Sequence, residues 1–158
     1  MIRFFGGRVM TLANGIETQD IEVWTEGSKI VFVGKPKAEE LDGKVFEREY
    51  DLKGNLLMPS FKNAHTHSAM TFLRSYADDM PLQDWLFKQI FPMEAKLDGE
   101  KVYWLTKLAI LEYLTTGCTA AFDMYFELDD YVKACIESGF RSVLCGAVSG
   151  DKSNLERL

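Results

Sequence analysis

The chain has 158 residues, of which 47% are hydrophobic and 27% charged, a balance that is typical of a globular protein and excludes a disordered or fibrous one. Its net charge of −6 is spread along the sequence, which argues against nucleic acid or an anionic membrane surface as a partner. Without a secretory leader, a membrane-span-length apolar run or closely paired cysteines, we expect a cytoplasmic protein.

The pattern of residues 1–57 predicts short strands. Residues 21–25 and 29–33 flank Glu26-Gly27-Ser28, a strong signal for a β-hairpin with glycine in its turn. The predicted strands are too few and too short to make a closed domain. We therefore expect partner strands from elsewhere.

After Pro59 the hydrophobic period changes, and strand patterns alternate with helix patterns. The expected order of strand, helix, strand, helix and strand falls on residues 60–65, 100–116, 119–124, 129–138 and 141–148. This alternation predicts parallel βα units.

The helix predicted over residues 100–116 has recognisable ends. Asp98 is placed as its N-cap, and Gly117 stands where a glycine commonly follows the last turn. Five apolar residues at helical spacing predict its core-facing stripe: Trp104, Leu105, Leu108, Ala109 and Leu111.

The connection over residues 66–97 is long for a βα loop, where two to six residues are usual. It contains Trp85, Phe87 and Phe91, and we expect short helices within it. Long loops at the carboxyl ends of parallel strands commonly carry binding residues, so function is expected here.

The only two histidines, His65 and His67, are two residues apart where the first strand runs into this loop. Residues i and i+2 of a strand point to the same side, so both imidazoles can bind one zinc-like ion. A pair of ordinary polar loop histidines fits the spacing equally well. A catalytic zinc usually has three protein ligands, so the pair would be an incomplete site.

Three aspartates can supply a carboxylate to such a site: Asp78, Asp79 and Asp123. Asp123, at the end of the next strand, has the best placement. For it we favour a buried outer acid or a helix cap over a metal ligand.

The residues around the histidines resemble a known family. Met58-Pro59-Ser60-Phe61-Lys62-Asn63-Ala64-His65-Thr66-His67-Ser68 is similar to the segment that opens the barrel of amidohydrolase-superfamily enzymes. Residues 69–82, Trp85-Leu86, residues 91–97 and Asp123-Met124-Tyr125-Phe126 resemble the branch of S-adenosylhomocysteine and 5′-methylthioadenosine deaminases, with chlorohydrolases and guanine deaminases close by.

The resemblance implies an α/β fold, the N-terminal portion of a (β/α)8 TIM barrel preceded by strands of a small β-sandwich. Residues 1–57 would belong to the sandwich, which the family builds from both ends of the chain, and residues 58–158 would form the first βα units. A barrel of this kind has eight strands and about 250 residues, so it is incomplete in this chain.

The resemblance also assigns roles to individual residues. His65 and His67 match the first two ligands of a single divalent metal ion, zinc in the first place and iron as the alternative. Glu94 matches the carboxylate that binds the substrate's ribose hydroxyls, against a solvated helix acid as the alternative. Trp85 falls near the ligand, where an aromatic packing residue is equally expected.

The implied activity is metal-dependent hydrolytic deamination of an amino-purine nucleoside such as S-adenosylhomocysteine or methylthioadenosine. Cys145-Gly146-Ala147 lacks the arginine that these deaminases use in substrate recognition. A chlorohydrolase, a guanine deaminase, a cyclic-amide hydrolase and a non-catalytic assembly module therefore stay open.

The remaining ligands and the residues that transfer protons belong to later strands in the family. We therefore expect no catalytic residue in this chain and no activity from it alone. The expected partners are a small-molecule substrate and a second copy or the complementary remainder of the barrel.

Overall fold

The computed structural model describes residues 1–13 and 15–146 of the chain. The chain forms two compact units, Met1–Pro59 and Ser60–Leu158. Within the described residues, no helix combines the length and the apolar composition that crossing a membrane requires.

The first unit is built of short strands with a single helical turn. Its elements are β1 (Ile2–Phe5), β2 (Arg8–Met10), β3 (Thr18–Gln19), β4 (Glu22–Glu26), β5 (Lys29–Gly34), α1 (Ala38–Leu41), β6 (Arg48–Asp51) and β7 (Leu56–Leu57). They make a four-stranded sheet in the order β5-β4-β1-β6 and a three-stranded sheet in the order β3-β2-β7. The predicted hairpin is confirmed as β4 and β5, with Gly27 at a φ of 55° in its turn.

A cavity of about 700 Å³ within this unit is lined by apolar side chains of both sheets, including Phe4, Val9, Val23, Val33 and Leu57. Val9 and Val23 are buried, whereas Ile30, Val31 and Val33 on β5 are exposed. The two sheets thus leave part of their apolar surface uncovered, as expected for a layer that lacks partner strands.

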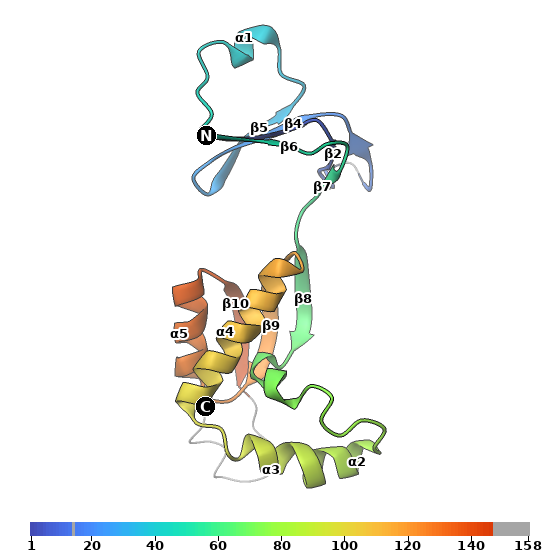
Figure 1. Ribbon diagram of the computed structural model, residues 1–158, viewed down its shortest axis with the longest axis vertical. Helices are drawn as coiled ribbons and strands as arrows, with labels where there is room; N and C mark the ends of the chain where they lie inside the picture. The colour runs from blue at the N-terminus through green and yellow to red at the C-terminus, as the bar shows by residue number, and fades with distance from the viewer. Residues whose placement is uncertain (14, 147–158) are drawn as a thin grey trace. The chain divides into compact units, whose positions relative to one another are not determined.

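The second unit is a parallel sheet with helices on one face (Figure 1). Its elements are β8 (Phe61–Thr66), η1 (Ser68–Leu73), α2 (Leu82–Asp84), η2 (Trp85–Ile90), α3 (Phe91–Glu94), α4 (Gly99–Thr115), β9 (Cys118–Tyr125), α5 (Leu128–Ser138) and β10 (Arg141–Gly146). The strand order is β10-β9-β8, and both neighbouring pairs are parallel.

This order confirms the predicted alternation of strands and helices, and the short helices between β8 and α4 confirm those expected in the long connection. Residues 147 and 148, which were predicted to continue the last strand, lie outside the described residues. Figure 1 shows α2 and α3 beyond the end of the sheet toward which the β8 arrow points.

The predicted ends of α4 are confirmed. The Asp98 carboxylate accepts a hydrogen bond from the Lys101 backbone N–H at 3.0 Å, and Gly117 follows the helix with a φ of 82°. Glycine adopts this left-handed conformation without the steric cost of a Cβ atom.

The predicted core stripe of α4 is wrong in three of its five positions. Trp104, Leu108 and Leu111 are 61%, 43% and 59% exposed, and only Ala109 and the partly buried Leu105 pack against the core. The buried face is instead Val102, Thr106, Ala109 and Ile110. Because α4 is apolar on more than one side, its sequence alone does not tell which side meets the sheet.

The face of the sheet that α4 and α5 do not cover is also apolar. It carries Phe61, Phe122, Met124 and Val143, all of them between 37% and 61% exposed. The strands alternate, so that Ala121, Asp123 and Tyr125 of β9 are buried on the other face. The described strands form an open sheet and no closed barrel.

Candidate metal and substrate site

The two histidines lie at the carboxyl end of β8. His65 is on the strand and His67 directly follows it, and their ring centroids are 5.0 Å apart with the ring planes at 81°. Two imidazoles on one tetrahedral ion, with metal–nitrogen distances of about 2.0–2.1 Å, have ring centres about 5 Å apart. The pair therefore has the separation that a shared ion requires.

One nitrogen of His67 already has a partner. Its Nδ1 lies 2.8 Å from the backbone carbonyl oxygen of Met124, at the end of β9. A carbonyl oxygen can only accept, so Nδ1 carries a proton, and in the neutral imidazole Nε2 then keeps its lone pair. This is the arrangement by which metal-binding histidines are usually oriented. Every residue has a backbone carbonyl, so the sequence does not show which one accepts the hydrogen bond from His67. This partner was therefore not predicted.

Asp123 is 1% exposed and accepts the backbone N–H of Ser68 at 3.2 and 3.3 Å through its two carboxylate oxygens. Ser68 begins η1, so the carboxylate caps the start of that helix. The sequence favoured a buried outer acid or a helix cap for Asp123, and the structure shows a buried carboxylate bonded to the first N–H of η1. Asp78 and Asp79 are exposed in the loop before α2.

A cavity of about 420 Å³ opens beside His67, within the range of about 300–1,000 Å³ that is common for small-molecule sites. It is formed by the carboxyl end of the β10-β9-β8 sheet and by the long connection between β8 and α4. Its lining residues are His67, Met70, Trp85, Leu86, Ile90, Phe91, Glu94, Met124, Tyr125, Phe126 and Gly146.

The cavity brings together three of the four residues that were singled out from the sequence, namely His67, Trp85 and Glu94. His65 does not line it, although its ring contacts that of His67. Glu94 ends α3 and is only 6% exposed, so it is not the solvated acid that was the alternative. Trp85 begins the π-helical segment η2 and is half-buried.

The lining is mostly apolar and aromatic, with one carboxylate and one imidazole to orient a ligand. Such a lining suits a flat, partly apolar ring that carries a few polar groups. Over the residues that the structure describes, no group of three or more His, Cys, Asp and Glu side chains can hold a metal ion. Among the described residues, His65 and His67 are thus two possible zinc ligands that lie side by side.

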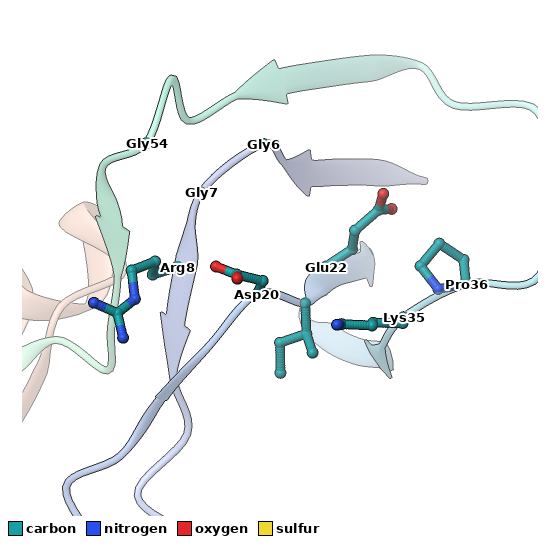
Figure 2. A pocket seen from close by; sticks show the side chains of 9 residues that line it. Gly6, Gly7, Arg8, Asp20, Glu22, Lys35, Pro36 and Gly54 are labelled. Atoms are coloured by element: carbon teal, nitrogen blue, oxygen red, sulfur yellow. The ribbon is translucent and has the colours of Figure 1, made fainter.

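The first unit has a separate cavity of about 490 Å³ (Figure 2). It is lined by the backbone of three glycines and by charged side chains of both signs, Arg8, Asp20, Glu22 and Lys35. Glu22 there is already bonded to Arg3 at 2.6 and 2.7 Å. This cavity contains neither of the histidines and none of the residues predicted to bind substrate.

Comparison with known proteins identifies the family. The amidohydrolase family model matches residues 56–158. This range includes β8, both histidines and every lining residue of the cavity beside His67. The chain belongs to the amidohydrolase family.

Curated amidohydrolase relatives include two kinds of deaminase. The 5-methylthioadenosine/S-adenosylhomocysteine deaminase of Desulfitobacterium hafniense is 43% identical over 136 residues, which are 86% of this chain and 31% of that protein. The 5′-deoxyadenosine deaminase of Methanospirillum hungatei is 52% identical over 108 residues, 67% of this chain and 24% of that protein. The chain thus spans a third or less of the length of these relatives.

Solved structures share the fold of most of this chain. The adenosine deaminase of Xanthomonas campestris, crystallised with bound zinc, aligns with a TM-score of 0.82 and 33% identity over 90% of this chain and 33% of its own. Atrazine chlorohydrolase from Arthrobacter aurescens, in complex with zinc, aligns with a TM-score of 0.80 over 98% of this chain and 37% of its own. At 22% identity, the second likeness shows the fold alone.

Proposed function

We propose that this chain supplies the first two metal ligands and part of the substrate cavity of a hydrolytic deaminase that acts on an amino-purine nucleoside. The observation that carries the proposal is the hydrogen bond from His67 Nδ1 to the Met124 carbonyl, which leaves Nε2 available next to His65 and beside a cavity. A divalent ion, zinc or else iron, would supply Lewis-acid activation of water at this place.

The proposed substrate class rests on the cavity and on the relatives together. Relatives at 43–52% identity are deaminases of methylthioadenosine, S-adenosylhomocysteine and 5′-deoxyadenosine, all of them 6-aminopurine nucleosides. We assign Glu94 to the ribose hydroxyls, since a buried carboxylate in an apolar wall is a strong hydrogen-bond acceptor. Trp85 would pack against the purine or the 5′ substituent.

The proposal includes the rest of the barrel as a partner. The uncovered sheet face with Phe122 and Val143, and the exposed stripe of α4, would be buried by the remaining βα units. Likewise, the two sheets of the first unit would be the N-terminal part of a small β-sandwich, with the cavity between them filled by strands from elsewhere. The remaining βα units of the barrel would also bring the missing metal ligands and the proton-transfer groups.

The test of the reaction is substrate profiling of the zinc-loaded enzyme that contains this chain. Ammonia release from 5′-methylthioadenosine, S-adenosylhomocysteine or 5′-deoxyadenosine is the expected result. Release of chloride from a chlorotriazine, without ammonia release from any adenosine derivative, would instead assign the chain to the chlorohydrolases. Atrazine chlorohydrolase shares the fold of this chain.

The test of the site is metal content. His65→Ala and His67→Ala should each lower bound zinc at least about tenfold, since each removes one protein ligand. Glu100→Gln is the control, because Glu100 is an exposed acid in the first turn of α4 and lies outside the cavity beside His67. Equal zinc content in the unmodified enzyme and both histidine variants would mean that the pair binds no metal, and would favour a non-catalytic module.

A further inference from the structure

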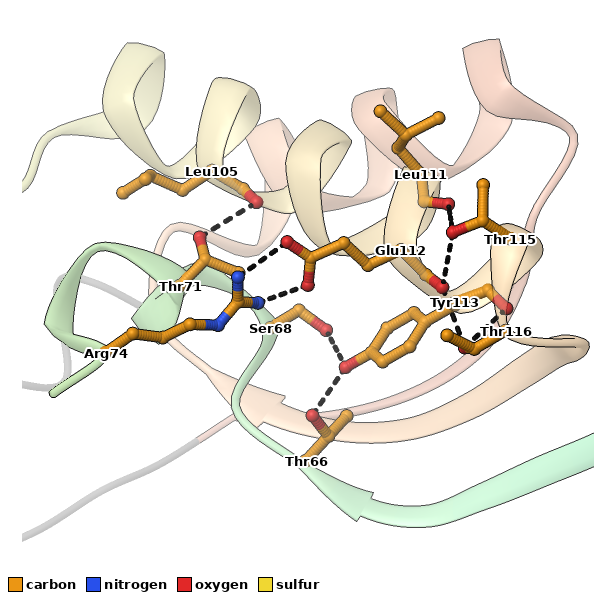
Figure 3. Close-up of polar contacts among 10 residues, drawn as sticks. All are labelled: Thr66, Ser68, Thr71, Arg74, Leu105, Leu111, Glu112, Tyr113, Thr115 and Thr116. Atoms are coloured by element: carbon orange, nitrogen blue, oxygen red, sulfur yellow. Dashed lines mark hydrogen bonds and ion pairs between the residues drawn. The ribbon is translucent and has the colours of Figure 1, made fainter.

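The side chains on both sides of His67 contact one hydroxyl group. Tyr113 Oη lies 2.5 Å from Thr66 Oγ1 and 3.0 Å from Ser68 Oγ, so a single side chain connects the residue before His67 with the residue after it (Figure 3). Tyr113 belongs to α4 and is far from His67 in sequence. Since every group here is a hydroxyl, the three can form a continuous chain in which Tyr113 donates one bond and accepts the other.

The helix that carries Tyr113 is held against η1 by further contacts. The same side of α4 holds η1 through two more contacts: Thr71 Oγ1 donates to the Leu105 carbonyl oxygen at 3.3 Å, and the Arg74 guanidinium forms a two-point ion pair with Glu112 (Figure 3). The Tyr113 ring also stacks on Phe140 at a centroid distance of 5.5 Å. The position of the hydroxyl is thus fixed by the helix and by the ring packing.

Two side-chain contacts of the same segment come from β9. Asp123 accepts the Ser68 backbone N–H, and the Met124 carbonyl accepts His67 Nδ1–H. The three residues Thr66, His67 and Ser68 are therefore held between α4 and β9. A small shift of this backbone would lengthen the 2.8 Å bond that sets the tautomer of His67.

From this arrangement we infer that Tyr113 is a positioning residue for the metal site. Its hydroxyl fixes Thr66 and Ser68 and thereby keeps the His67 imidazole on the Met124 carbonyl, with Nε2 free to bind a metal ion. The link to metal binding rests on the proposed function of His67, whereas the effect on the tautomer does not.

The variant Tyr113→Phe tests the inference, because it removes the hydroxyl and keeps the ring that stacks on Phe140. Tyr103→Phe is the matched control: Tyr103 also lies on α4, and its hydroxyl donates to Glu137 at 2.5 Å, on a contact that involves neither Thr66 nor Ser68. Thr66→Val and Ser68→Ala each remove one half of the connection and should act in the same direction more weakly.

The first readout is the tautomer of His67 in the metal-free chain, from long-range 1H–15N NMR of 15N-histidine-labelled protein. The chain has two histidines, so His65→Ala assigns the signals. We expect the Nδ1–H form in the unmodified chain and in Tyr103→Phe, and a mixture with the Nε2–H form in Tyr113→Phe. The same tautomer in Tyr113→Phe as in Tyr103→Phe would overturn the inference.

The second readout is zinc affinity of the enzyme, measured by competition with a chromogenic chelator. Loss of an outer partner of a metal-bound histidine typically weakens binding by about 10–100-fold, and Tyr113 acts one residue further away, so we expect a loss of about 3–10-fold. Unchanged affinity in Tyr113→Phe would contradict the inference. If the unmodified enzyme binds no zinc while the tautomer still responds to Tyr113→Phe, the positioning role stands and the proposed metal site falls.

Discussion

The imidazole of His67 donates from Nδ1 to the carbonyl oxygen of Met124, and these two residues also line one cavity. The contact is possible because β8 and β9 are neighbouring parallel strands, so that their carboxyl ends lie at the same edge of the sheet. The orientation of the proposed metal ligand and one wall of the proposed substrate site therefore depend on the same strand end.

Glu94→Gln should weaken substrate binding and leave metal binding unchanged. Hydrogen bonds to a charged group contribute about 1.5–3 kcal/mol, so KM for 5′-methylthioadenosine should rise by about 10–100-fold. Steady-state kinetics of the enzyme with this substrate and with its 2′,3′-dideoxy analogue measure the effect, which should be smaller for the analogue.

Glu100→Gln is the control for that measurement, because Glu100 is an exposed acid in the first turn of α4 and lies outside the cavity. An unchanged KM for the ribose-bearing substrate in Glu94→Gln would contradict the assignment of Glu94 to the ribose hydroxyls.

The first unit should lose stability in acid through Glu22. Its carboxylate accepts two hydrogen bonds from Arg3 and one from Trp24 Nε1. The bonds from Arg3 lower the pKa of Glu22, against the opposing effect of burial. A lowered pKa in the folded state means that the stabilisation is complete above the ordinary glutamate value of about 4.3 and is lost as the pH falls through the folded-state pKa.

Glu22→Gln should therefore lower the free energy of unfolding at pH 7 by about 1.5–3 kcal/mol and flatten its decline between about pH 5 and 3. Urea unfolding followed by Trp24 fluorescence, in a background with Trp85→Phe and Trp104→Phe, reports on this unit alone. Glu49→Gln is the control, since Glu49 takes a single bond from Arg3 at a more exposed position. Equal effects of the two variants would rule out the partly buried Arg3–Glu22 pair as the cause.

Two adjacent residues of α4 test which side of the helix meets the core. Ile110 is 2% exposed and Leu111 is 59% exposed. Ile110→Ala should lower the free energy of unfolding by about 2–5 kcal/mol, because it leaves a cavity in the core. Leu111→Ala should change it by about 0.5 kcal/mol or less, as is usual at a surface. Urea unfolding monitored by far-UV circular dichroism compares them; a larger loss at Leu111 would reverse the assignment of the faces.

The positions of these elements were predictable where the signal is local. The ends of α4 follow from Asp98 and Gly117, and the β4–β5 hairpin follows from Gly27 between two β-rich runs. The two-residue spacing of His65 and His67 likewise predicted adjacent rings, because neighbouring side chains on one side of a strand come close.

What the sequence did not predict depends on contacts between distant residues. The partner of His67 is a backbone carbonyl, which every residue has, and the link from Tyr113 to Thr66 and Ser68 joins elements that the chain separates by a long connection. The exposed stripe of α4 was predicted to face the core because both sides of the helix are apolar. A hydrophobic period shows which residues share one face of a helix, but not which element that face packs against.

The 158-residue chain by itself should bind zinc weakly and show no deaminase turnover in excess zinc. Catalytic zinc commonly has three protein ligands, and the described residues bring only His65 and His67 together. Ammonia release from 5′-methylthioadenosine is the measurement, with the zinc-loaded enzyme of full barrel length as the positive control. Turnover by the 158-residue chain would mean that the site is complete without further βα units, and two imidazoles would then have to hold the metal ion without a third protein ligand.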